Sequence, residues 1–171
     1  VDLDQQDGFN DPASAPWGVV LSNAGDLTAN VTIELNDTAP EELPSPQVIN
    51  QYTIEPGQLE QVILPTRELD CGIVPNDYGS PGTCLSSRSF RISSSNPIVV
   101  YQFNVFQNTY SNDASLLLPS NALGHVYRVI NWSAGHPAPI NFPPLPLIVD
   151  RSYVTIVGVS EGTNVRVRPS W

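Results

Sequence analysis

Lysine and methionine are absent from this 171-residue sequence, and its seven basic residues are all arginines. Seventeen aspartates and glutamates give the chain a formal net charge of −10. A surface with this excess of negative charge repels the phosphates of nucleic acids and anionic membrane surfaces. We therefore expect neither a nucleic acid nor an anionic membrane as a partner.

Long apolar runs and helical periodicity are also missing. No stretch of 18 apolar residues is present to span a membrane, and no long window repeats apolar residues at helical spacing. Apolar residues nevertheless make up 40% of the chain, and 17 prolines and 11 glycines punctuate it. This composition predicts a packed core built from short strands and turns, and therefore an all-β protein.

The sequence has little of what an enzyme needs. Its two histidines, His125 and His136, are not accompanied by the Gly-x-Ser-x-Gly motif that exposes a nucleophilic serine. Aspartate and glutamate are concentrated in segments expected to be turns or strand ends. We therefore expect no catalytic residues and no enzymatic activity.

Only two cysteines are present, Cys71 and Cys84, and the segment between them is rich in glycine and proline. Two cysteines without nearby histidines make a poor zinc site, so we expect a disulfide rather than free thiols. Such a bond would stabilise the fold by about 2–3 kcal/mol. It predicts an oxidising compartment, with the protein secreted or at the cell surface. Because the chain begins at Val1, we expect a processed piece of a longer precursor.

Short strand-like segments follow one another through the first two thirds of the chain. They lie at 17–22, 29–35, 47–54, 59–64, 87–93 and 98–106. In the second segment Val31, Ile33 and Leu35 alternate with polar residues, which is typical of a half-buried antiparallel strand. Near-regular spacing without helices predicts an immunoglobulin-like β-sandwich over residues 1–107.

The remainder predicts a linker at 108–125 and a second, incomplete β-sandwich unit at 126–171. Within the linker, 115–118 is interpreted as a strand, or one helical turn begins at Ser120. The second unit is expected to contain a strand at 126–132, a proline-rich excursion, and a closing hairpin with its turn at Glu161–Gly162.

The segments 17–35 and 153–168 share one plan. Each has an apolar strand, a glycine-containing turn and an alternating strand that contains Asn-Val. We interpret both as hairpins, related as a weak repeat. A truncated sandwich exposes strand edges, so we expect further polypeptide or a partner chain to cover them.

Four stretches, VVLSNAGDLTANVTIEL, PIVVYQFN, YSNDASLLLPSNALG and YVTIVGVSEGTNVRV, follow one another as in a known family. Together they resemble the IgGFc-binding-protein N-terminal domain, found in a mucin-associated vertebrate protein and in many large bacterial surface proteins. The resemblance implies a secreted or surface-anchored β module with adhesive or binding roles. Fc binding belongs to a few animal members and is not carried over, and the family has no catalytic residues to transfer.

Asp2, Asp4, Asp7 and Asp11 cluster at the start of the chain. Calcium takes about six to eight oxygen ligands, which these carboxylates and nearby carbonyls could supply. Their spacing departs by one residue from an EF-hand loop. The cluster is either a calcium site or a solvated acidic lead-in.

Three further residues are candidate ligand contacts. Trp171 lies at the chain end, and Asn112 and Asp113 lie between two apolar runs. The simpler role for Asn112 and Asp113 is to organise a turn through hydrogen bonds to the backbone. Trp17 and Trp132 lie in or beside apolar strands, so we expect them to pack in cores.

These features predict a non-enzymatic extracellular module for binding, adhesion or structure. Its ligand, a protein or a glycan, is expected at loops 36–50, 69–85 and 135–147, because a rigid sheet leaves variation to its loops. The alternative from another class is a secreted hydrolase, or a carbohydrate-binding accessory domain of one.

Overall fold

The computed structural model describes residues 16–39, 42–65, 85–103, 106, 113–130, 134–137, 147–150 and 154–169. The chain divides into two compact units, Val1–Leu118 and Pro119–Trp171. Across the described residues the regular structure is β-strand, with one 3-10 turn, η2 (Ser120–Ala122), and no α-helix. The prediction of an all-β protein is confirmed.

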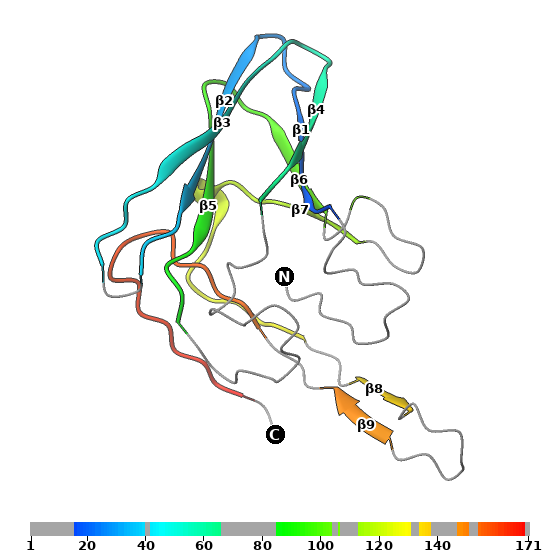
Figure 1. The fold of residues 1–171 in the computed structure, drawn as a ribbon, viewed down its shortest axis with the longest axis vertical. Coiled ribbons are helices and arrows are strands. Elements are labelled where there is room, and N and C mark those ends of the chain that lie inside the picture. Colours follow the sequence, from blue (N-terminus) through cyan, green and yellow to red (C-terminus); the bar gives the residue numbers. More distant parts are fainter. Residues whose placement is uncertain are drawn as a thin grey trace. The chain divides into compact units, whose positions relative to one another are not determined.

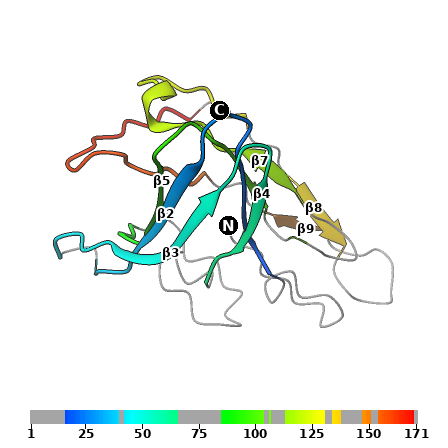
Figure 2. The same ribbon diagram turned by 90° about the horizontal axis from the view of Figure 1, so that it is seen from above.

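The first unit contains seven described strands in two antiparallel sheets. They are β1 (Gly18–Ser22), β2 (Ala29–Asn36), β3 (Gln47–Ile54), β4 (Leu59–Ile63), β5 (Ser89–Ser94), β6 (Val99–Phe103) and β7 (Ala114–Leu116). The strand order is β4-β1-β6-β7 in one sheet, here called sheet A, and β3-β2-β5 in the other, sheet B. Figures 1 and 2 show the two sheets side by side with their strands running in similar directions.

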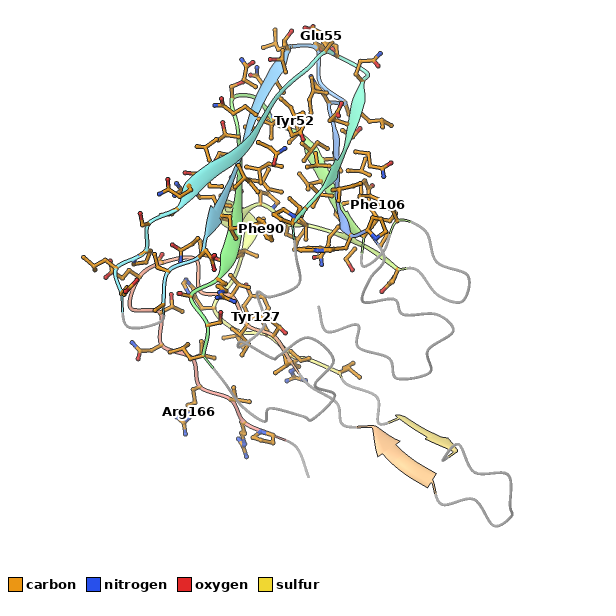
Figure 3. All side chains as sticks on the ribbon, in the orientation of Figure 1. Tyr52, Glu55, Phe90, Phe106, Tyr127 and Arg166 are labelled. Carbon is orange, nitrogen blue, oxygen red and sulfur yellow. The ribbon has the colours of Figure 1, made fainter. Side chains whose placement is uncertain are left out.

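The core of this unit lies between the two sheets. Eight buried apolar residues form one cluster, and both sheets contribute to it: Val19, Leu21, Val62 and Leu64 from β1 and β4 or next to them, and Ala29, Val31, Ile33 and Ile54 from β2 and β3. Figure 3 shows Tyr52 and Phe90 directed into the same space. The unit is therefore sandwich-like, as the sequence predicted.

Local sequence accounts for several elements. In β2, Ala29, Val31 and Ile33 are buried while Asn30 is exposed, as the alternation predicted. A tight turn at Glu55–Gln58 joins the two strands expected at 47–54 and 59–64: the Gln58 N–H donates to the Glu55 carbonyl at 3.0 Å, and Gly57 has φ +76°. Proline followed by a glycine of positive φ is the usual composition of a type II turn.

The connections differ from the hairpin expected at the start of the chain. The strands β1 and β2 do not pair; they lie in different sheets, and the turn between them crosses the core. The turn between β3 and β4 crosses in the same way, so tight turns here join the sheets rather than neighbouring strands. In an immunoglobulin constant domain the first two strands share a sheet, so this strand order does not establish the immunoglobulin arrangement.

A bulge in β3 lies opposite the end of β2. Pairing with β3 shifts between Ile33 and Glu34, which leaves Ile49 as the extra residue. Beyond it Leu35 is half-buried and Asn36 is buried. The pairing of β2 with β5 continues without a shift from Val31 to Asn36, so Leu35 stays on the face of Val31 and Ile33, as predicted. A bulge bends its strand and increases the local twist, which alternation alone does not reveal.

Each sheet has an outer face that points away from the core. The register places these residues on the outer face of sheet A: Gly18, Val20, Ser22, Leu59, Gln61, Ile63, Val99, Tyr101, Phe103, Ala114 and Leu116. It places these on the outer face of sheet B: Asn30, Thr32, Glu34, Val48, Gln51, Thr53, Arg91 and Ser93. The first set is mostly apolar and the second mostly polar.

The end of the first unit falls in the segment expected to be a linker. Ala114–Leu116 pairs with β6 as strand β7, and η2 begins at Ser120. The strand and the helical turn considered as alternatives for this segment both form. Sheet A therefore includes residues from the range 108–125.

The second unit differs from its expected strands. Residues 126–130 form no strand. The hairpin expected at the end has its turn, with the Thr163 N–H donating to the Ser160 carbonyl at 3.3 Å and Gly162 at φ +72°. Its flanks at 154–159 and 163–169 form no ladder. Instead β8 (Ala134–Pro137) pairs with β9 (Leu147–Asp150), on either side of the proline-rich excursion.

Candidate functional site

The candidate site lies where β2 leaves sheet B and the chain returns as β3. The connection, called loop 37–46 below, is described at residues 37–39 and 42–46. It falls within the range 36–50 that the sequence predicted as a ligand-binding loop. Its conformation is organised from β2 by one buried polar side chain, Asn36.

Asn36 connects three separate segments. Its Nδ2 donates to the Ser87 carbonyl at 2.7 Å and to Thr38 Oγ1 at 3.1 Å, while its Oδ1 accepts from the Ser45 N–H at 2.8 Å. The side chain is buried, with a relative exposure of 6%. Because a buried amide must find partners for both its oxygen and its nitrogen, Asn36 fixes the start and the end of the loop against the segment before β5.

Two ion pairs hold the same region from outside. Arg88 Nε lies 2.7 Å from Asp37 Oδ1, and the Ser87 hydroxyl donates to the Thr38 carbonyl. Across the outer face of sheet B, Arg91 Nε and Nη2 donate to the two carboxylate oxygens of Glu34 at 2.5 and 2.8 Å. These bidentate hydrogen bonds hold the pKa of Glu34 below its ordinary value and raise the pKa of Arg91.

An open pocket is formed at this end of sheet B. Its lining is Leu35, Asp37, Thr38, Ser45, Gln47 and Ile49. Two aliphatic side chains from β2 and β3 therefore meet two hydroxyls, one amide and one carboxylate from the loop and the start of β3. A few polar groups around an apolar surface are the usual composition of a ligand site. The bulge at Ile49 is part of this lining, and bulges are common next to functional sites.

The opposite end of the sandwich is held by a second buried amide, Asn23, which the sequence did not single out. Its Nδ2 donates to the carbonyls of Leu27 and Ile54 at 2.9 and 2.8 Å, and its Oδ1 accepts from the Gly25 N–H at 3.0 Å. The backbone of Asn23 bonds the turn at Gly57 and Gln58. Every polar group of Asn23 is therefore used, and this amide is structural.

Sequence reasoning missed Asn36 as well. The available signal was an amide that ends an alternating strand, directly before the polar pair Asp37–Thr38. Short polar side chains at such positions often bond the nearby backbone. The bond from Asn36 to the Ser87 carbonyl joins residues 51 apart in sequence, and no local pattern predicts it.

Most of the residues predicted as site residues lie outside the described part of the chain: Asp2, Asp4, Asp7, Asp11, Cys71, Cys84, Asn112 and Trp171. Asp113 is described. It is exposed, and its Oδ1 accepts from the Ala114 N–H at 2.8 Å as β7 begins. Asp113 is in a different strand connection from the pocket and does not line it.

Trp17 packs against the core of the first unit, as expected for a tryptophan beside an apolar strand. Its ring meets Phe90 edge-on, with ring centroids 5.6 Å apart. The Trp17 Nε1 is buried and has no hydrogen-bond partner within the described segments. Of the two histidines, His125 is exposed, and the side chain of His136 is not described.

Within the described ranges, no three histidine, cysteine, aspartate or glutamate side chains gather to hold a metal ion. The same ranges contain no helix long and apolar enough to cross a membrane. Comparisons with protein-family models, with characterised proteins and with solved structures found no match. Among the described residues, the pocket at loop 37–46 is a candidate site for a ligand.

Proposed function

We propose that the first unit is a non-enzymatic, extracellular binding module whose ligand occupies the pocket at loop 37–46. The observation that carries the proposal is the pocket itself: its lining combines the aliphatic residues Leu35 and Ile49 with polar groups on a loop that Asn36 holds in place. A loop fixed in this way loses little conformational entropy when a ligand binds.

The lining favours a peptide segment over a glycan. No aromatic ring lines the pocket, so it lacks the flat apolar surface on which a sugar ring can stack. The aliphatic part of the lining suits an apolar side chain, and its hydroxyl and amide groups suit peptide backbone. Asp37 supplies a carboxylate that is 65% exposed and already pairs with an arginine. A ligand arginine or lysine can make the same kind of pair.

The charge of the chain supports a basic partner. A net charge of −10 attracts cationic segments over a distance set by the ionic strength. We propose a protein ligand that presents a basic residue next to an apolar one. Secretion or display at the cell surface remains part of this proposal, based on composition.

A peptide array and a glycan array, both probed with the purified chain, test the proposal. We expect binding to peptides that combine arginine or lysine with aliphatic residues, weakened about tenfold by Asp37→Asn, since a hydrogen bond to a charged group contributes about this much. Glu42→Gln removes the same charge from the same loop, but Glu42 does not line the pocket. This matched control should bind like the parent.

Two results would contradict the proposal. Binding to glycans alone would overturn the assignment of a peptide ligand. Peptide binding that Asp37→Asn and Glu42→Gln weaken equally would show that net charge, and not the pocket, is recognised.

A further inference from the structure

The outer face of sheet A is apolar, exposed and free of formal charge. Leu59, Ile63, Tyr101 and Leu116 on this face are 64%, 59%, 41% and 53% exposed. Its polar members are Ser22 and Gln61, and no aspartate, glutamate or arginine belongs to it. On a chain of net charge −10, an uncharged apolar sheet face is typical of an interaction surface.

The two central strands of sheet A, β1 and β6, have the sequence of strands covered on both faces. GVVLS in β1 and VVYQF in β6 are nearly continuous apolar runs. Runs of this kind are typical of strands with no face in water, whereas a sheet with one wet face alternates. Strand β2 of sheet B alternates as expected. Of the two outer faces formed by the described strands, that of sheet A lacks the polar residues that water would favour.

Aromatic residues lie at one end of this face. Phe103 and Phe106 stack with ring centroids 5.3 Å apart, and the Phe106 N–H donates to the Pro16 carbonyl at 2.8 Å. A Cβ on Gly18 would lie 3.0 Å from the Phe106 ring, so the ring closes over that glycine. Figure 3 shows Phe106 beside β1, on the side away from sheet B.

We infer that this face packs against the same face of a second copy of the chain. Two antiparallel sheets of the same twist pack face to face at about −30°, and identical faces meet this condition. A two-fold arrangement also closes on itself and leaves no face open for a filament. Two acidic chains can approach here because neither brings a charge to the contact, whereas a cationic partner would gain nothing from it.

The area of this face determines how strongly two copies of the chain are expected to associate. Three strands of five residues and one of three, at about 4.8 Å between strands and roughly 3.4 Å per residue, give a footprint of roughly 300 Å² per copy. Stable complexes bury about 800 Å² per partner. The association is therefore weak and reversible, formed at high local concentration, as when many copies are displayed together. It is independent of the pocket at loop 37–46.

Analytical ultracentrifugation of the whole chain from micromolar to millimolar concentration tests this inference. We expect a reversible monomer–dimer equilibrium whose dissociation constant rises about tenfold or more in the variant Leu59→Gln/Ile63→Gln. Val48→Gln makes the same kind of change at a residue that is 55% exposed on the outer face of sheet B, and it should leave the dissociation constant unchanged. Unfolding midpoints establish that the variants fold, and Leu116→Gln on β7 provides a second variant.

Salt gives an independent readout. Since no ion pair forms in the contact, added sodium chloride should leave the dimer unchanged or strengthen it, while an association made by charges would weaken. A chain that stays monomeric throughout overturns the inference and assigns this face to a different polypeptide. A dimer that Val48→Gln weakens as much as Leu59→Gln/Ile63→Gln also overturns it.

Discussion

The two outer faces of the sandwich differ in the residues that they present to solvent. On the outer face of sheet B the threonines, asparagine and glutamine are joined by the ion pair of Glu34 and Arg91, and Val48 is the apolar exception. The outer face of sheet A is mostly apolar instead, and Ser22 and Gln61 are its polar exceptions. Both sheets share one core, so burial of the inner faces does not explain the difference.

The difference teaches that apolar content and apolar alternation carry separate information. The alternation in β2 indicates a strand with one face in water. The continuous apolar runs in β1 and β6 indicate strands with neither face in water. In the first unit the two patterns occur in the two sheets of one sandwich. The polar layer carries the loop with the candidate pocket, and the apolar layer carries the proposed contact between copies.

The largest expected effect tests whether the two inner faces really form one core. Leu21→Ala on β1 and Ile33→Ala on β2 each remove a side chain that is 0% exposed. Each should lower the free energy of unfolding by about 2–5 kcal/mol, because a cavity remains between the sheets. Urea denaturation measures this. A large loss in only one of the two variants would show that the sheets do not share their core.

The next largest effect is a loss of stability at each end of the sandwich, where Asn23 and Asn36 lie. Asn23→Ala and Asn36→Ala each leave buried backbone groups without partners, at a cost of about 1–3 kcal/mol each. Only Asn36→Ala should also release loop 37–46 and weaken ligand binding at the pocket. Denaturation combined with amide chemical shifts of residues 37–46 separates the two variants. Equal shifts in that loop for both would contradict a local role for Asn36.

Much of this fold could be predicted from local sequence. Alternation located β2, the Pro56–Gly57 turn located the end of β3, and the apolar runs located β1 and β6. The pairing of strands could not be predicted in the same way. The turns after β1 and β3 have ordinary turn sequences, and a short turn can join neighbours in one sheet or cross between sheets. The expected opening hairpin was wrong for this reason.

The candidate site was predicted only as a range. The loop at 36–50 was expected because loops vary, but its pocket depends on the bulge at Ile49 and on the distant Ser87 carbonyl. Neither has a sequence signal. In the second unit a strand was predicted at 126–132 and an alternating strand in the closing hairpin, but the structure forms no strand at 126–130 or 163–168. Alternation provides an apolar face, but a strand also needs a neighbour to bond.

A smaller effect distinguishes the two outer faces directly. Ile63→Thr on sheet A and Val48→Thr on sheet B replace similarly exposed aliphatic residues, at 59% and 55%. Both should change the free energy of unfolding by no more than about 0.5 kcal/mol, as is usual for surface positions. Only Ile63→Thr should reduce the fluorescence of a dye that binds exposed apolar surface, because Val48 stands alone among polar residues. Equal reductions would remove the contrast between the faces.

The smallest effect concerns the charged pair on the polar face. Because Arg91 lowers the pKa of Glu34 in the folded chain, the folded state binds its proton less readily than the unfolded chain does. The stabilisation by this carboxylate is complete above the pKa of the unfolded carboxyl, and it is lost as the pH falls through the lowered folded value.

Glu34→Gln removes this titration. The difference in unfolding midpoint between the parent and Glu34→Gln should therefore shrink as the pH is lowered from neutral into the acid range. Arg91→Gln should show the same behaviour, and the double variant should lose no more than either single change, since both remove one interaction. High salt should reduce the difference at neutral pH, because the Arg91 side chain of the pair is 64% exposed. If parent and Glu34→Gln lose stability in parallel with falling pH, the bond to Arg91 does not perturb the carboxyl, and the polar face is held by its neutral side chains alone.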